Sequence, residues 1–206
     1  NKHFIAKQSI YNVFFFFFSK KKLELAEENY ELGLQEFYTE KLDKAKEYFE
    51  YALSLAPYNK EYKECLIQIK KEENKTIAEE KIMIGIAELN NGNANKAIQY
   101  FDDALNIYES AKSFFLRGKA FLTQGNITLC EKAIYNFNKA ISLEADNSEY
   151  YFYCGKAHFE RYNYNEALEC FNKAINLKND NWEYYYQRGL TNNEVGNYAD
   201  SIEDYS

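Results

Sequence analysis

One pair of side chains has a spacing that could do chemistry. Cys154 and His158 are four residues apart, so on a helix they would lie on the same face. Such a pair could form a thiolate-imidazole couple or supply half of a metal site. The only other histidine is His3, so a Ser-His-Asp or Cys-His arrangement would have to use one of these two imidazoles.

The remaining residue types give weaker signals. The four cysteines form no Cys-x-x-Cys pair and no close Cys/His cluster in the sequence, so we expect neither a zinc site nor a disulfide framework. The glycines form no phosphate-binding loop. Carboxylate pairs such as Asp102-Asp103 and Glu203-Asp204 fit solvent-facing helix positions. We therefore predict no enzyme, no catalytic residue, no cofactor and no metal ion.

The composition favours a folded, helical chain. Of 206 residues, 46% are hydrophobic, which argues against general disorder. Eight glycines and one proline are too few for an all-β protein with many tight turns. The formal net charge of −7 repels polyphosphates, so we expect no nucleic-acid partner.

The sequence repeats itself with a period near 34 residues, which is typical of a helix-turn-helix unit. The separation is 34 for each of three pairs: Gly155 and Gly189, Ala167 and Ser201, Phe171 and Tyr205. Five frames of this kind begin at about Ala26, Ala78, Ala111, Ser148 and Trp182. Because two helices alone cannot bury the resulting apolar stripes, the units must stack.

This frame resembles the tetratricopeptide repeat. Small residues stand at its eighth, twentieth and twenty-seventh places and aromatic residues at its eleventh and twenty-fourth, as in Gly155, Ala167, Phe171 and Ala174. All eight glycines fall at the eighth place or at the fifteenth, where the turn lies, and Pro57 stands at the thirty-second. The resemblance implies an all-α, right-handed α-solenoid. It also places Cys154 and His158 against the partner helix, which favours packing over chemistry.

The frame divides the chain into seven segments. Residues 1–22 form a Phe-rich N-terminal segment, and residues 60–77 fall outside the frame as an extra helix and loop, with a cap at Thr76. A single helix from Lys60 to Asn90 is the alternative for this second segment. The repeats span residues 23–59, 78–110, 111–147, 148–181 and 182–206, the last one truncated. In the third repeat, the turn from Gly125 to Glu131 gains three residues.

The resemblance also assigns a binding groove to the first helices of the repeats. The groove positions carried over to this sequence are Tyr30, Leu34, Phe37, Ile82, Ile86, Leu89, Phe115, Lys119, Leu122, Phe152, Lys156, Phe159, Tyr186 and Leu190. This wall is aromatic and aliphatic, and it lacks the Lys, Asn and Arg set with which some family members clamp a chaperone carboxylate. It favours an apolar helix or extended segment, with Lys119 and Lys156 able to select acidic groups.

We therefore predict a protein-interaction scaffold within a larger assembly, in a reducing intracellular compartment, cytoplasmic or cytoskeletal. A permanent architectural rod in a filament or axoneme-like complex is one alternative. The docking region of an enzyme whose catalytic domain lies outside this fragment is another. RNA binding by helical repeats conflicts with the negative charge and the 34-residue spacing. The same apolar positions could instead pack against another part of the protein.

A short apolar block runs from Val13 to Phe18 and is followed by Ser19 and three lysines. The block is far shorter than the roughly 20 residues that a membrane helix requires. A signal peptide would place its basic residues before the apolar block and a small-residue cleavage site after it. We therefore expect the phenylalanines to cover an apolar surface, either of this solenoid or of a neighbour.

Overall fold

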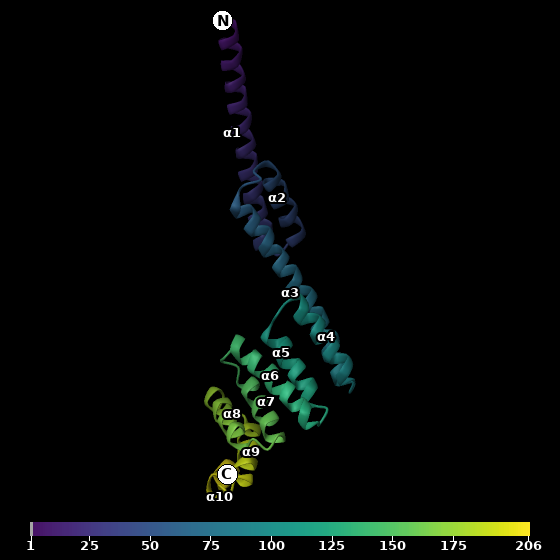
Figure 1. Ribbon diagram of the computed structural model, residues 1–206. Helices are drawn as coiled ribbons and strands as arrows, with labels where there is room; N and C mark the ends of the chain where they lie inside the picture. The colour runs from purple at the N-terminus through teal and green to yellow at the C-terminus, as the bar shows by residue number, and fades with distance from the viewer. Residues whose placement is uncertain (1) are drawn as a thin grey trace. The chain divides into compact units, whose positions relative to one another are not determined.

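A computed structural model describes residues 2–206, with side chains described from residue 16 onward. Every regular element in this described part of the chain is an α-helix, as Figure 1 shows, and the ten helices follow one another with short connections. The chain forms two compact units, residues 1–74 and residues 75–206. The all-α solenoid expected from the sequence is thereby confirmed.

The first unit contains α1 (Lys2–Tyr38), α2 (Leu42–Leu55) and the beginning of α3 (Lys60–Asn90). Its core is built from small side chains that let the helices approach, with a few large ones between them. The fully or almost fully buried members are Ala26, Ala45, Phe49, Ala52, Tyr62 and Ile69. Pro57 lies in the turn between α2 and α3, where the frame placed it.

The helix and loop expected at residues 60–77 do not form. Helix α3 is continuous from Lys60 to Asn90, which is the alternative predicted for this segment. The polar run from Lys70 to Lys75 consists largely of strong helix formers, and no glycine or proline interrupts residues 60–84. Within the first unit, the ammonium group of Lys46 on α2 donates to a carboxylate oxygen of Glu73 at 2.9 Å. Thr76 therefore lies inside a helix and does not cap one. A polar run of helix-forming residues does not end a helix.

The boundary expected at residues 22 and 23 is not a structural break either, because α1 runs through it to Tyr38. The lysines at positions 20–22 are good helix formers, so they continue the helix. Phe16, Phe17 and Phe18 lie on this helix with 67%, 65% and 74% of their surface exposed, so they cover no surface among the described side chains of the first unit. Phe14 and Phe15 lie outside the residues whose side chains are described.

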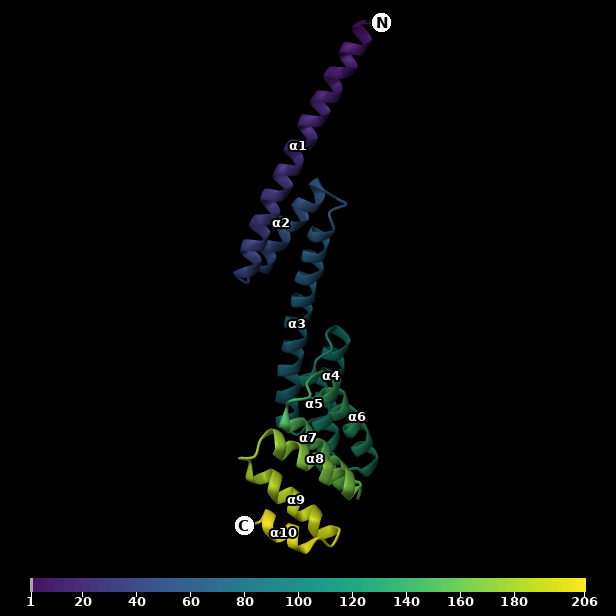
Figure 2. The same cartoon turned by 90° about the vertical axis from the view of Figure 1, so that its left-hand side faces the viewer.

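The second unit is a stack of helical hairpins (Figure 2). After the end of α3 come α4 (Ala94–Ile107), α5 (Ala111–Leu122), α6 (Ile127–Leu143), α7 (Ser148–Glu160), α8 (Tyr164–Leu177), α9 (Trp182–Glu194) and α10 (Tyr198–Asp204). The two helices of a repeat pack together, and the second helix also contacts the first helix of the next repeat. Each repeat is thus covered by the one that follows.

One close contact holds the two helices of every repeat together. A Cβ built on Gly118 would lie 2.6 Å from Cε1 of Phe137, a distance that real Cβ atoms essentially never show. The same relationship recurs in all five repeats: Gly33 with Phe49, Gly85 with Phe101, Gly118 with Phe137, Gly155 with Phe171, and Gly189 with Tyr205. The eighth place is therefore glycine because an aromatic ring of the twenty-fourth place occupies the space of its side chain.

The turn inside each repeat uses a left-handed backbone at the fifteenth place. Gly92, Gly125 and Gly196 have φ of 80°, 62° and 83° there, and Glu40 and Tyr162 adopt 60° and 62° at the equivalent places. After Tyr162, the amide of Asn163 donates to the carbonyl of His158 at 3.0 Å, as in a Schellman motif. The turn geometry is thus the same whether or not glycine is present.

The three extra residues of the third repeat lengthen a helix and not the turn. Helix α6 has 17 residues, whereas α4 and α8 have 14 each.

Asn126 caps α6, because its side chain accepts a hydrogen bond of 2.8 Å from the amide of Thr128. Asn147 and Asn181 cap α7 and α9 in the same way, each at 3.0 Å.

No helix in the described part of the chain combines the length and apolarity needed to cross a membrane.

Candidate functional site

The first helices of the last three repeats lie next to one another. Helix α5 contacts α7, and α7 contacts α9, although each pair is separated in sequence by the second helix of a repeat. In a curved stack the elements on the inner side approach most closely, so this contact is expected where the first helices line the concave face. We refer to the surface formed by the adjacent helices α5, α7 and α9 as the first-helix face.

Three of the residues predicted for the groove are core residues. Ile82, Phe115 and Phe152 retain 2%, 6% and 2% of their exposure, so the prediction that they line an open groove is wrong. The ring of Phe115 packs on Tyr150 with centroids 4.8 Å apart, and that of Phe152 packs on Tyr184 at 4.7 Å. Each phenylalanine is therefore covered by a tyrosine of the following repeat.

These tyrosines also keep their hydroxyl groups satisfied. The hydroxyl of Tyr150 donates to a carboxylate oxygen of Glu144 at 3.1 Å. Burial raises the pKa of Tyr150 to about 12, and the hydrogen bond to Glu144 is the second largest cause of this increase. The hydroxyls of Tyr184 and Ser148 lie 3.2 Å apart. The contacts between successive repeats are thus aromatic in the middle and hydrogen-bonded at the edge.

The two predicted lysines are accessible and occupy equivalent places one repeat apart. The side chains of Lys119 and Lys156 keep 27% and 32% of their exposure. Each lies near a glutamate of the next repeat, with Lys119 Nζ 3.8 Å from Glu149 and Lys156 Nζ 3.9 Å from Glu183. These separations exceed hydrogen-bond distance, so the ion pairs are loose.

Tyr153 lies between the two lysines. The ammonium nitrogen of Lys119 is 4.5 Å from the centroid of its ring, and that of Lys156 is 5.5 Å from it. Both ammonium groups are therefore within cation–π range of the same tyrosine ring. The groove prediction omitted Tyr153, and nothing in a single repeat indicates that lysines of two repeats would meet there. Glu149 and Glu183 were also omitted, although both stand at the second place of their repeats.

The other predicted residues of the second unit are partly or well exposed. Ile86, Leu89, Leu122, Phe159 and Leu190 are half-buried, and Tyr186 is 44% exposed. A cleft of about 360 Å³ lies between the beginnings of α7 and α9, lined by Glu149, Tyr153, Asn181 and Glu183 among others. The first-helix face thus offers a polar cleft, two lysines and several aromatic edges.

The predicted residues of the first unit pack against its own core. Tyr30, Leu34 and Phe37 are half-buried and contact the cluster formed by Ala45, Phe49 and Ile69. The rings of Tyr30 and Tyr62 have centroids 4.8 Å apart, which repeats the aromatic pairing of the second unit. Part of each of these three side chains stays exposed, as it does for the half-buried residues of the second unit.

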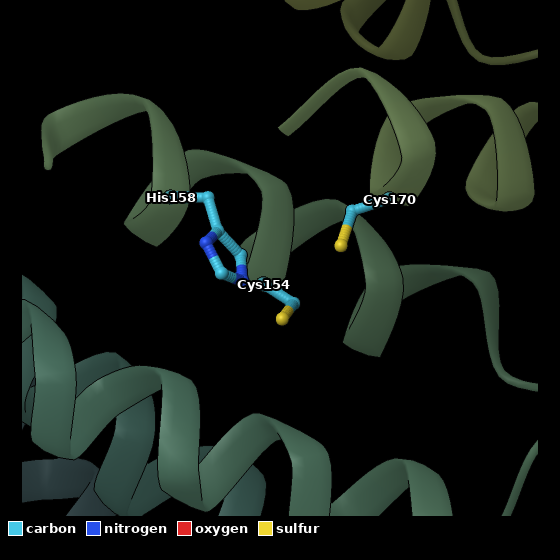
Figure 3. Close-up of side chains that lie close together, drawn as sticks. All are labelled: Cys154, His158 and Cys170. Carbon is cyan, nitrogen blue, oxygen red and sulfur yellow. The ribbon is translucent and has the colours of Figure 1, made fainter. Parts of the chain in front are cut away.

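A cluster of sulfur and nitrogen donors lies inside the fourth repeat. Figure 3 shows Cys154 and His158 on α7 with Cys170 across from them on α8. One donor atom from each residue lies within 4.8 Å of the other two. The sequence shows no close Cys/His cluster, because Cys170 joins the other two residues only through the helical hairpin.

The cluster is largely removed from water. Cys154 is 1% exposed, and Cys170 and His158 are partly buried. Burial lowers the pKa of His158 from its ordinary value of 6.5, so the imidazole is neutral near pH 7. Its Nδ1 is buried and accepts no hydrogen bond. The hydrogen bond between the thiols lowers the pKa of Cys170, while that bond and burial raise the pKa of Cys154.

Comparison with known proteins agrees with this architecture. The family model for the TPR repeat matches residues 158–196. MamA from Desulfovibrio magneticus RS-1 is 16% identical and superimposes with a TM-score of 0.58, covering 88% of this chain and 91% of that one. No curated protein sequence matches the chain.

Two further solved structures resemble a shorter part of the chain. The Arabidopsis OM64 TPR domain is 24% identical, has a TM-score of 0.55 and covers 57% of this chain and 96% of that one. The first TPR of Spaghetti (RPAP3), bound to the HSP90 peptide SRMEEVD, is 16% identical, with a TM-score of 0.56 and coverage of 59% and 98%. Together with the five interlocked repeats, these matches show that the chain has the fold of a tetratricopeptide-repeat solenoid, and the family model identifies a TPR repeat over residues 158–196.

Proposed function

We propose that the chain is a non-enzymatic scaffold that holds a polypeptide segment along the first-helix face of α5, α7 and α9. The fold supports this proposal, since the similar first TPR of Spaghetti (RPAP3) binds an HSP90 peptide. The observation that carries it is the pair of accessible lysines, Lys119 and Lys156, spaced by one repeat on that face. A periodic pair of cations fits a ligand that is itself extended or helical.

The chemistry of the face favours a segment with both acidic and apolar side chains. Because Phe115 and Phe152 are buried, the accessible apolar groups are the edges of Tyr153, Phe159 and Tyr186. Ion pairs between exposed side chains contribute only about 0–1 kcal/mol each. A ligand carboxylate can therefore replace Glu149 or Glu183 beside a lysine at little cost. The ligand would also bury the aromatic edges, which supply the larger part of the affinity.

A peptide-display selection against the full chain tests the proposal. We expect enriched peptides to combine Asp or Glu with Leu, Phe or Tyr, and to bind about two- to fivefold more weakly to Lys156→Ala, because an exposed ion pair is lost. Lys173→Ala is the matched control, since Lys173 is exposed on α8, the second helix of the same repeat. Peptides that bind equally well to both variants, or no enrichment at all, would refute the proposal.

A cross-linking experiment locates the ligand independently. A photoreactive phenylalanine at position 186 should react with the selected peptide, whereas the same group at position 135 should not. Tyr186 is 44% exposed on α9, and Tyr135 is 56% exposed on α6, so accessibility does not favour the first position. Equal reaction at both positions would place the peptide somewhere other than the first-helix face.

A further inference from the structure

The donor cluster of the fourth repeat has the composition and spacing of a metal site. Cys154 and His158 project from the same side of α7, because they are four residues apart, and Cys170 approaches from α8 (Figure 3). The three donor atoms lie within 4.8 Å of one another. Zn–S and Zn–N bonds of about 2.3 and 2.0 Å put the ligands of a tetrahedral ion roughly 3.5 Å apart. Binding an ion therefore requires the three side chains to move closer together.

The donors select one class of metal ion. Two thiolates and an imidazole bind the zinc class of ions, whereas Mg²⁺ and Ca²⁺ require oxygen ligands. The imidazole of His158 makes no hydrogen bond at its buried Nδ1. The three residues therefore offer the protein ligands of a site whose fourth position stays open to water or to another side chain.

The surroundings favour a cation. Glu166 and Glu169 on α8 act on His158 electrostatically, and both also act on Cys170. Arg161 is the one opposing charge among the groups that act on His158. On the side of the third repeat, Oδ1 of Asn138 accepts a hydrogen bond from the thiol of Cys154 at 3.7 Å. This amide oxygen is within reach of an ion bound to Cys154, and is a candidate for the fourth ligand.

We propose that Cys154, His158 and Cys170 bind one zinc-class metal ion that links the two helices of the fourth repeat. Each thiol gives up its proton to solvent as a metal–sulfur bond forms, and nothing is oxidised or reduced. The bound ion joins α7 to α8 from inside the hairpin, and it does not depend on a ligand occupying the first-helix face. The consequence is a fourth repeat whose stability responds to zinc.

Titration of the reduced, metal-free full chain with Co²⁺ and then Zn²⁺ tests this site. We expect one Co²⁺ per chain, with the visible absorption of tetrahedral cobalt and the charge-transfer band of cobalt–thiolate bonds, and full displacement by Zn²⁺. Zn²⁺ should also raise the unfolding temperature, because the folded state, which holds the three donors together, binds it more tightly than the unfolded chain does. A chain that shows no cobalt absorption and no zinc-dependent stabilisation would overturn the proposal.

Single substitutions assign the ligands. Cys170→Ser and His158→Gln should each weaken Co²⁺ binding by at least about tenfold. Cys170→Ser should also reduce the cobalt–thiolate charge-transfer band, because one of the two thiolates is lost, whereas His158→Gln keeps both thiolates. Cys65→Ser is the matched control, since Cys65 is also a half-buried free thiol but lies on α3, outside the cluster. Circular dichroism of the metal-free variants confirms that each is folded. Wild-type binding in Cys170→Ser, or an equal loss in Cys65→Ser, would contradict the assignment.

Discussion

Gly155 and Phe171 share one volume: a Cβ on Gly155 would lie 2.7 Å from Cε1 of the ring, and Phe171 is completely buried. A buried ring cannot move aside without displacing its own neighbours, so a side chain at position 155 would strain the packing of α7 on α8.

Gly155→Ala and Gly155→Val should both destabilise the chain. Alanine and valine overpack the contact with Phe171, at a cost of roughly 1–3 kcal/mol that exceeds the gain in helix propensity. The free energy of unfolding, measured with urea, gives the comparison. Lys173→Ala serves as the control, because this exposed α8 residue should change stability by less than about 0.5 kcal/mol. An alanine variant as stable as wild type would show that the ring can relax.

Phe171→Ala should open a cavity in the same hairpin and cost roughly 3–5 kcal/mol. Phe171→Leu should cost less, and it should also reduce the penalty of Gly155→Ala, because a smaller side chain leaves room for the new methyl group. A double-mutant cycle on the urea unfolding of the four proteins measures this coupling. Additive effects of the two substitutions would argue against direct contact between positions 155 and 171.

Glu40→Gly and Tyr162→Gly should stabilise the chain by about 1 kcal/mol each. Both residues have a left-handed φ, which is strained for a residue with a Cβ atom and unstrained for glycine. Both side chains are exposed, so little packing is lost. The reverse change, Gly92→Ala, should destabilise the chain, because Gly92 has a φ of 80° that strains alanine. The new methyl group would lie in open space, so it would gain no packing to offset this strain. Thermal unfolding of the three variants provides the measurement. A loss of stability in both glycine variants would contradict the strain argument.

The stability of the metal-free protein should fall as the pH drops below about 6.5. Burial lowers the pKa of His158 from 6.5, so the unfolded chain binds this proton more readily than the folded chain does. The stabilisation is complete above the unfolded value and is lost as the pH falls through the folded value. NMR titration can follow His158 directly, since His3 is the only other histidine.

A variant separates this effect from the titration of carboxylates. In His158→Phe, the decrease in unfolding free energy between about pH 7 and pH 5 should be smaller than in wild type. An unshifted His158 resonance, or the same pH dependence in both proteins, would show that burial of the imidazole carries no penalty.

The sequence was most informative about the fold at positions where contacts within a single repeat restrict the type of residue. Glycine at the eighth place and an aromatic residue at the twenty-fourth recur because they fill the same space, so their spacing alone predicted the hairpins. It was least informative about connections. The polar run from Lys70 to Lys75 was expected to be a loop and is helical, because it contains helix-forming residues and no breaker.

The candidate sites depended more strongly on neighbours. The sequence gives no measure of how deeply Phe115 and Phe152 are covered, because the tyrosines that bury them belong to the next repeat. Cys154 and His158 could be paired from their spacing of four, whereas Cys170 joins them only through the hairpin of α7 and α8.

By itself, then, the sequence determined the helical hairpins and their number, because contacts within a repeat impose a fixed period on small and aromatic side chains. Tertiary structure alone decided which groove residues stay accessible and which donors meet. Stacking brings together side chains more than 30 positions apart, such as Phe115 with Tyr150 and Phe152 with Tyr184, and no local pattern records such contacts.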